Sequence, residues 1–170
     1  MSDVASAGAT PSQTVGPFFA FGLCIRPHHE LVDPGRADAV RISGRVLDGA
    51  GEPVFDAMVE IWGADANGGH RDGFGWGRSG TDADGRYGFV TVKPGGGGAP
   101  FLTVLIFARG LLKPLMTRIY FPGEPANAAD PLLAALTDAE RDGLTATTVD
   151  GELRFDIHLQ GEHETVFLAV

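Results

Sequence analysis

The histidines are the residues of this sequence best suited to bind a metal ion. None of the five stands in an H-x-H or HExxH spacing, which would bring two imidazoles to one ion. His158 falls on the polar side of an alternating segment, and the pair His28–His29 lies in a polar stretch, so we interpret these three as solvated. His70 lies in a long glycine-rich stretch, where function often resides. It is the one histidine that could face a site, although a plain surface role stays open.

The sequence contains no complete motif for a nucleophile, a phosphate or calcium. Cys24 has neither a nearby base nor a CxxC partner, which is typical of an inert thiol. The glycines at 95–98 precede an apolar stretch and not a helix, so they cannot place a phosphate at a helix N-terminus. Asp82 and Asp84 have a calcium-like spacing but lack the later glutamate, so we expect a turn.

Two arginines lie at or inside apolar segments. Arg109 follows the apolar run 101–108, and Arg118 lies inside LMTRIYF. A guanidinium in such a place needs a carboxylate of its own chain, a partner chain or an anionic ligand. A structural ion pair is the commoner of these answers, and the sequence leaves all three open.

Composition limits the classes of protein that must be considered. The chain has 170 residues, of which 44% are hydrophobic and 21% charged, as in one globular domain. Its 25 glycines and 11 prolines disfavour a helical bundle. The net charge of −9 opposes binding to nucleic acid or to an anionic membrane. A single cysteine, no apolar run of membrane length and no signal-peptide pattern at the start together predict a cytoplasmic location.

Short segments with strand-like patterns, separated by turn residues, supply the framework. They predict a mainly β protein, an antiparallel β-sandwich, as one domain over 1–170 with its core in 40–170. We expect the stretch 63–80 to be a loop and 101–108 to be buried on both faces. The predicted strands lie at 40–46, 57–62, 86–92, 101–108, 115–121 and within 151–161.

One short helical excursion is predicted near residues 130–142. Asp130 and Pro131 suit the N-cap and the first helical position. Thr137 and Glu140 have the spacing of a capping box.

The segment 10–21, TPSQTVGPFFAF, is predicted to be irregular, yet it has much apolar surface to bury. It must lie against its own domain or against a partner. The residues alone thus describe an acidic sandwich without a self-sufficient catalytic set, which favours a binding module or a subunit.

Six stretches, taken in order, resemble the intradiol ring-cleaving dioxygenases. The opening, the FARG segment and the ending resemble the alpha subunits of the two-chain members. The stretches are TPSQTVGPFF (10–19), ISGRVLDGAGEPVFDAMVEIWGADANG (42–68), GRSGTDADGRYGFVTVKPG (77–95), APFLTVLIFARGLL (99–112), TRIYF (117–121) and RFDIHLQGEHETVFL (154–168).

The resemblance implies an alpha–beta hetero-oligomer with a sandwich of the intradiol type. It implies O₂-dependent cleavage of 3,4-dihydroxybenzoate to 3-carboxy-cis,cis-muconate, in the β-ketoadipate route of aromatic catabolism. The Fe(III) of such an enzyme is non-heme iron held by two tyrosines and two histidines of the beta subunit.

The resemblance also locates the ligand positions in this chain. Phe101 and Thr103 stand where the family has its H-x-H pair, and His70 stands where it has one tyrosine. The second tyrosine would fall in the shortened connector Gly95–Gly98. One imidazole cannot hold Fe(III), so we expect no metal and no catalytic residue on this chain, with the iron on the beta subunit.

The resemblance gives the amino-terminal segment a role. We expect residues 1–39 to form an arm and loop that pack on the partner subunit, with the substrate at the interface. The expected substrate-binding residues are Thr14, Gly16, Pro17, Phe18 and Arg109. A guanidinium suits an aromatic carboxylate because it offers paired donors.

Two other interpretations remain open at this point. One is a non-catalytic sandwich module of the transthyretin-like or carboxypeptidase-regulatory-like kind, which shares the DGxGxPV and DGxYxF patterns but has no need of the opening segment or of FARG. The other is an independent intradiol enzyme for a different catechol, which the missing H-x-H pair disfavours.

Overall fold

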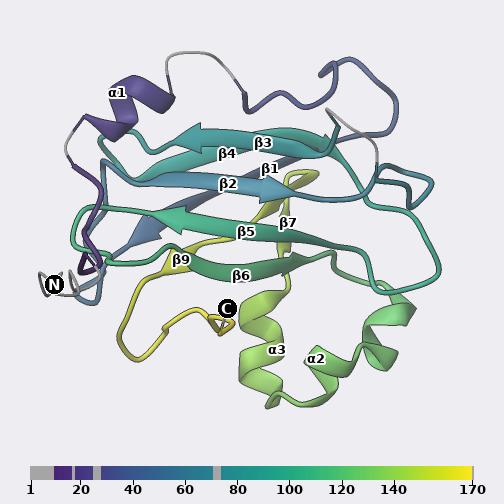
Figure 1. The fold of residues 1–170 in the computed structure, drawn as a ribbon. Coiled ribbons are helices and arrows are strands. Elements are labelled where there is room, and N and C mark those ends of the chain that lie inside the picture. The colour runs from purple at the N-terminus through teal and green to yellow at the C-terminus, as the bar shows by residue number, and fades with distance from the viewer. Residues whose placement is uncertain (1–9, 17, 25–27, 71–73, 170) are drawn as a thin grey trace, which may run out of the picture.

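Two β-sheets packed face to face form the body of the protein (Figure 1). The computed structural model describes residues 10–16, 18–24, 28–70 and 74–169. One sheet has the strand order β4 (Arg86–Val92), β1 (Ala39–Leu47), β8 (Glu152–Arg154) and β7 (Thr147–Val149), with β9 (Ile157–His158) also paired to β1. The other has the order β3 (Trp76–Gly80), β2 (Met58–Trp62), β5 (Phe101–Phe107) and β6 (Leu115–Tyr120). The predicted β-sandwich is confirmed.

The core lies between the two sheets, because each inner strand presents alternate apolar side chains to it. Ile42 and Val46 of β1 face inward from one sheet, and Val59 of β2 and Val104 of β5 from the other. All four have at most 1% of their surface exposed. Burial of these side chains is the main favourable term that holds the sheets together.

Two predictions about the second sheet are wrong. The stretch 63–80 is not all loop, since β3 occupies its last five residues and pairs along the whole of β2. Its alternating pattern is weak because glycines stand at two of its five positions. The strand at 101–108 is buried on one face only: Leu102, Val104 and Ile106 are buried, whereas the residues between them are half-exposed.

The carboxy-terminal stretch departs from the prediction as well. The alternation within 151–161 marks two short strands, β8 and β9, and both pair with β1 in parallel. The first sheet is therefore mixed and not wholly antiparallel. Of the four positions that the alternation places inward, Leu153, Phe155 and Ile157 are buried, and Leu159 is half-buried against the same core.

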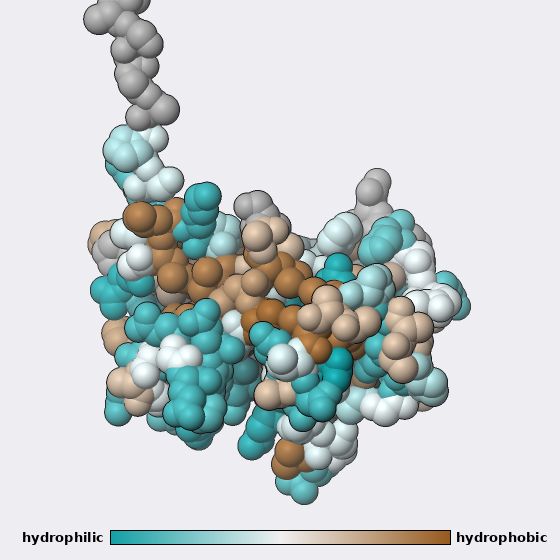
Figure 2. All heavy atoms as spheres, turned by 90° about the horizontal axis from the view of Figure 1, so that it is seen from below, coloured by the Kyte–Doolittle hydropathy of each residue, from teal (hydrophilic) through white to brown (hydrophobic). Residues whose placement is uncertain are grey.

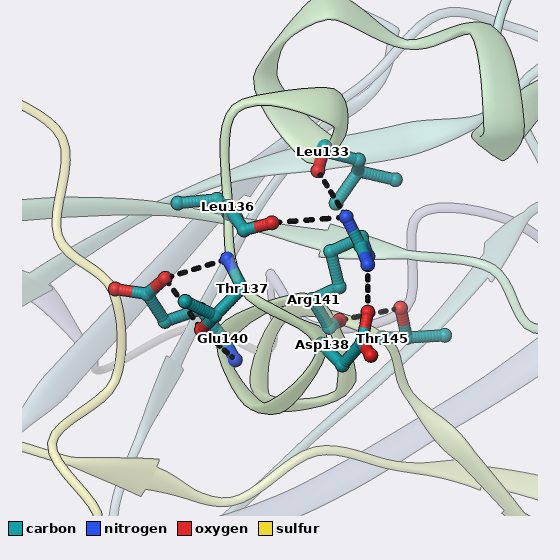
Figure 3. Close-up of polar contacts among 7 residues, drawn as sticks. All are labelled: Leu133, Leu136, Thr137, Asp138, Glu140, Arg141 and Thr145. Atoms are coloured by element: carbon teal, nitrogen blue, oxygen red, sulfur yellow. Dashed lines mark hydrogen bonds and ion pairs between the residues drawn. The ribbon is translucent and has the colours of Figure 1, made fainter.

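The helical excursion is confirmed and begins slightly earlier than predicted. It consists of the 3₁₀ helix η1 (Pro125–Ala129) and the helices α2 (Pro131–Ala134) and α3 (Asp138–Leu144). Asp130 caps α2, accepting from two backbone N–H groups. Thr137 and Glu140 form the predicted capping box, and Arg141 ties the two helices together by donating to the carbonyls of Leu133 in α2 and of Leu136 just after it (Figure 3).

The amino-terminal segment contains a short helix, α1 (Phe19–Leu23), where an irregular chain was predicted. The residues after it contact the chain's own sheets: the N–H of Arg78 donates to the carbonyl of His28 at 3.0 Å, and that of Leu31 to Val90 at 2.8 Å. Among the helices of the described residues, none is long and apolar enough to cross a membrane.

Candidate functional site: a pocket over the second sheet

A pocket of about 310 Å³ lies at one end of the second sheet, on its outward face. Its floor is a row of cross-strand neighbours, because Trp62 of β2 pairs with Thr103 of β5, and Thr103 pairs with Arg118 of β6. Two loops close its sides. It is lined by Trp62, Gly63, Ala64, Gly68, His70, Pro94, Gly95, Gly98, Ala99, Pro100, Phe101, Thr103 and Arg118.

Close backbone contact holds the two loops together. The carboxylate of Asp65 accepts hydrogen bonds from two N–H groups of its own loop, and its carbonyl accepts from the N–H of Gly95 at 2.9 Å. A side chain at Gly95 would collide with the loop, since its Cβ would lie 2.0 Å from the carbonyl oxygen of Ala66. This contact places the glycine-rich connector beside the loop that contains His70.

Arg118 is held in the pocket without a carboxylate beside it. Its guanidinium carbon lies 3.9 Å from the centre of the Phe101 ring, and its Nη1 donates to the hydroxyl of Tyr120 at 3.0 Å. That hydroxyl donates in turn to Asp130 at 3.0 Å. Burial raises the pKa of Tyr120, so its hydroxyl stays protonated and serves as this link. None of the salt bridges among the described residues includes Arg118.

The four positions that the sequence comparison with dioxygenases singled out come together here. Phe101, Thr103, His70 and the connector Gly95–Gly98 all contribute to this pocket or its rim. The His70 ring packs on Trp62 with the ring centres 4.9 Å apart, so His70 does face a site.

The donor set of the pocket does not fit an iron ion. It offers one imidazole and one hydroxyl, and the guanidinium of Arg118 would repel a cation. Within the part of the chain that the structure describes, no group of three or more His, Cys, Asp and Glu side chains could hold a metal.

Arg109 lies elsewhere, at the turn after β5. It forms an ion pair through Nε with the carboxylate of Asp56 and lies 5.7 Å from the centre of the Phe55 ring. About half of its side chain, 48%, is exposed, so it can contact another molecule as well as Asp56.

The amino-terminal segment reaches this turn. The N–H of Gly110, next to Arg109, donates to the hydroxyl of Thr14 at 2.7 Å. Gly16 is exposed and Phe18 is 78% exposed, whereas Pro17 lies outside the described residues. The structure thus brings Thr14 and Arg109 together, away from the pocket over the second sheet.

A larger hollow of about 440 Å³ lies on the first sheet, around Arg45, Arg86 and Arg154. These arginines are exposed, and Arg86 pairs with Asp84. The hollow is mainly polar, and Tyr87 is the one aromatic residue among its described lining residues.

Two further ionisable groups are suited to structural and not catalytic roles. Burial raises the pKa of the Cys24 thiol, which leaves it less reactive. Burial also raises the pKa of Tyr87, whose hydroxyl donates to the carbonyl of Phe155 at 2.6 Å inside the core.

The residue patterns alone treated Arg109 and Arg118 alike, the family resemblance singled out Arg109, and neither singled out Trp62. The pairing register separates the two arginines: Arg118 lies two residues from Tyr120 on β6 and directly opposite Thr103. Trp62 occupies an outward position of β2, opposite Thr103 of β5. It could have been singled out if a pocket had been expected on the outer face of this sheet.

Comparison with known proteins places the fold in a family. Residues 24–101 match the dioxygenase family model. The chain is 41% identical to the protocatechuate 3,4-dioxygenase alpha chain of Burkholderia cepacia, over 95% of this chain and 97% of that one. It is 34% identical to the beta chain of the same organism's protocatechuate 3,4-dioxygenase, over 75% of this chain and 67% of that one.

A solved structure agrees with these relatives. The dioxygenase domain of a dioxygenase carbohydrate-binding protein fusion from Streptomyces sp. SirexAA-E superposes with a TM-score of 0.66 at 29% identity, covering 91% of this chain and 99% of that one. The resemblance seen in the sequence motifs is confirmed, and the transthyretin-like interpretation is not favoured. The chain belongs to the intradiol ring-cleaving dioxygenase family.

Proposed function

We propose that this chain is the non-iron alpha subunit of a protocatechuate 3,4-dioxygenase. With a beta chain it forms the enzyme that inserts both atoms of O₂ into 3,4-dihydroxybenzoate and yields 3-carboxy-cis,cis-muconate. The observation that supports this most is the similarity to an alpha chain over nearly the whole length of both chains.

The iron is assigned to the partner. Intradiol dioxygenases are iron-dependent. In this chain the pocket that unites the family's ligand positions holds Phe101, Thr103 and His70, a donor set that does not fit Fe(III). The beta chain is therefore the subunit that we expect to bind it.

The alpha chain contributes to the substrate pocket of the assembly. Thr14 and Arg109 lie on one surface, joined through the hydrogen bond from Gly110. Their exposure leaves them able to face a partner's site together with Gly16, Pro17 and Phe18. An arginine here would bind the carboxylate of the substrate by paired donors.

The surface of the chain suits a permanent partner. Large hydrophobic side chains are exposed beside the second sheet, near Arg109, among them Phe55 at 59% and Leu112 at 61%. Seen from below, a band of hydrophobic residues crosses the surface between hydrophilic margins (Figure 2). Such surfaces mark interfaces between subunits.

The predicted cytoplasmic location stays a prediction.

The test is to express the chain alone and together with the beta chain, and to measure iron content, visible absorbance of tyrosinate-bound Fe(III) and cleavage of 3,4-dihydroxybenzoate. We expect a colourless, iron-free chain alone and a coloured, active pair. Stoichiometric iron on the chain alone, or failure of the two chains to form a complex, would contradict the proposal.

A matched variant tests the assignment of the iron. His70→Ala removes the one imidazole of the pocket over the second sheet. The iron content of the assembled enzyme should equal that of the native one. A loss of iron in this variant would mean that the alpha chain holds it.

A further inference from the structure

We propose that the pocket over the second sheet binds a planar aromatic carboxylate without cleaving it. This inference concerns a site of this chain alone, and its test uses this chain alone, so its outcome does not depend on the proposed function.

The first argument is the state of Arg118. Its Nη1 donates to Tyr120, and the described residues supply no acceptor for Nε or Nη2 and no carboxylate within salt-bridge distance. Asp130 is reached only through the Tyr120 hydroxyl. The guanidinium is thus held in place by its neighbours and still has two donor groups that a carboxylate can accept from.

The second argument is the shape and chemistry of the walls. Trp62 and Phe101 present aromatic surface, and Pro94 and Pro100 add apolar surface beside them. A volume of about 310 Å³ is ample for one substituted ring. A phosphate ion would contact the guanidinium of Arg118 but not the apolar walls, whereas an aromatic carboxylate contacts both.

The third argument is the accessible rim. The connector Gly95–Gly98 consists of glycines, so none of its residues has a side chain that could cover the opening. A Cβ at Gly98 would meet nothing within 4 Å. The exposed His70 ring packs at a tilt against Trp62 on the other side of the opening. A ligand can therefore enter between the connector and the loop that contains His70.

The pocket binds its ligand without ring cleavage because its described lining residues offer no donor set for iron. Thr103 offers one hydroxyl to a ring substituent or to the carboxylate. Arg118 is accordingly a binding residue, and Tyr120 with Asp130 position it.

The test is isothermal titration of the purified full chain with benzoate, and with benzamide as its neutral counterpart. We expect one benzoate per chain, with benzamide bound about ten-fold more weakly or worse, since a charge-assisted hydrogen bond is lost. Arg118→Gln should weaken benzoate about ten-fold or more and leave benzamide unchanged.

Two glycine variants keep the test decisive even if Arg118→Gln folds poorly. Gly98→Leu fills the rim and should abolish binding, whereas Gly97→Leu is its matched control, because Gly97 has the same open surroundings but does not line the pocket. Arg41→Gln, on the other sheet, is the control for loss of a positive charge. The proposal is wrong if benzoate fails to bind at millimolar concentration, or if it binds Gly98→Leu as tightly as the native chain.

Discussion

Two arginines of the second sheet show how residue type and neighbourhood together set a role. Arg109 and Arg118 both border the same apolar strand, β5. Arg109 is paired with Asp56 and half-exposed, whereas Arg118 stacks on Phe101 and donates to Tyr120. The first is suited to an interface and the second to a ligand. The pairing of β2 with β5 brings Asp56 to Arg109, whereas the pairing of β5 with β6 brings Phe101 to Arg118.

At this scale we predict that Arg109→Gln raises the KM of the assembled enzyme for 3,4-dihydroxybenzoate about ten-fold or more, because a paired-donor contact to the carboxylate is lost. Steady-state kinetics and an iron assay check it, and the iron content should not change. Asp56→Asn is the matched variant: it breaks the same ion pair but keeps the guanidinium. An equal rise in KM for both variants would show that Arg109 acts through the ion pair alone.

At the scale of elements, the close approach of β1 to the segment between β8 and β9 joins the carboxy-terminal stretch to the first sheet. The N–H of Phe155 donates to the carbonyl of Ser43 at 2.9 Å, and Tyr87 donates to the carbonyl of Phe155. Gly44 makes this possible, because a Cβ there would lie 1.8 Å from the oxygen of Phe155.

We predict that Gly44→Ala lowers the free energy of unfolding by about 2–4 kcal/mol, since the two strands must move apart. Gly88→Ala on the neighbouring strand is the control. Its nearest atom would be 3.6 Å away, and it should change stability by less than about 1 kcal/mol. Denaturant unfolding of both variants measures the difference, and equal stabilities would contradict the assignment of Gly44 as a close-approach position.

The helix α3 depends on its capping box. The side chain and backbone N–H of Thr137 donate to Glu140 and lower the pKa of its carboxyl below the ordinary 4.5. A lowered pKa in the folded state stabilises the protein above the ordinary pKa, and this contribution disappears as the pH falls through the lowered value.

We therefore predict that Thr137→Ala destabilises the protein by about 1 kcal/mol at pH 7. The difference in Tm between the native chain and Glu140→Gln should be larger at pH 7 than at pH 3. Thr148→Ala, at an exposed position of β7, serves as the control for loss of a threonine hydroxyl. A Tm difference for Glu140→Gln that is the same at both pH values would refute the role of the carboxylate.

At the scale of the whole molecule, the amino-terminal segment and the exposed hydrophobic residues define how the chain meets a partner. Thr14 fastens the segment to the turn beside Arg109, and Phe18 is largely exposed. The residues from His28 onward are held by the chain's own strands. The part of the arm before them is what we propose to contact the beta chain.

Deletion of residues 1–19 should weaken assembly with the beta chain, because it removes Thr14 and the exposed Phe18. Gel filtration of the mixed chains at decreasing concentration measures it. The Tm of the deleted chain alone should stay close to that of the full chain, since its core residues begin at Val32. Normal assembly of the deleted chain would refute the role of the arm.

Local patterns in the sequence were enough to establish the framework of this protein. Alternation located most strands, and the residues at the caps located α2 and α3, because periodicity and capping depend on neighbours in the chain. The in-order motifs indicated the family, and they were also enough to name the replaced ligand positions Phe101, Thr103 and His70.

Features that depend on contacts between distant segments emerged only in the folded chain. The strand β3 lies in a stretch whose glycines weaken the alternating pattern, and it is defined by its pairing with β2. The strands β8 and β9 pair in parallel with β1. The fold also paired Arg109 with Asp56 and left Arg118 over an aromatic pocket. Strand register brings residues from separate strands to one face, and no local pattern of the chain contains that information.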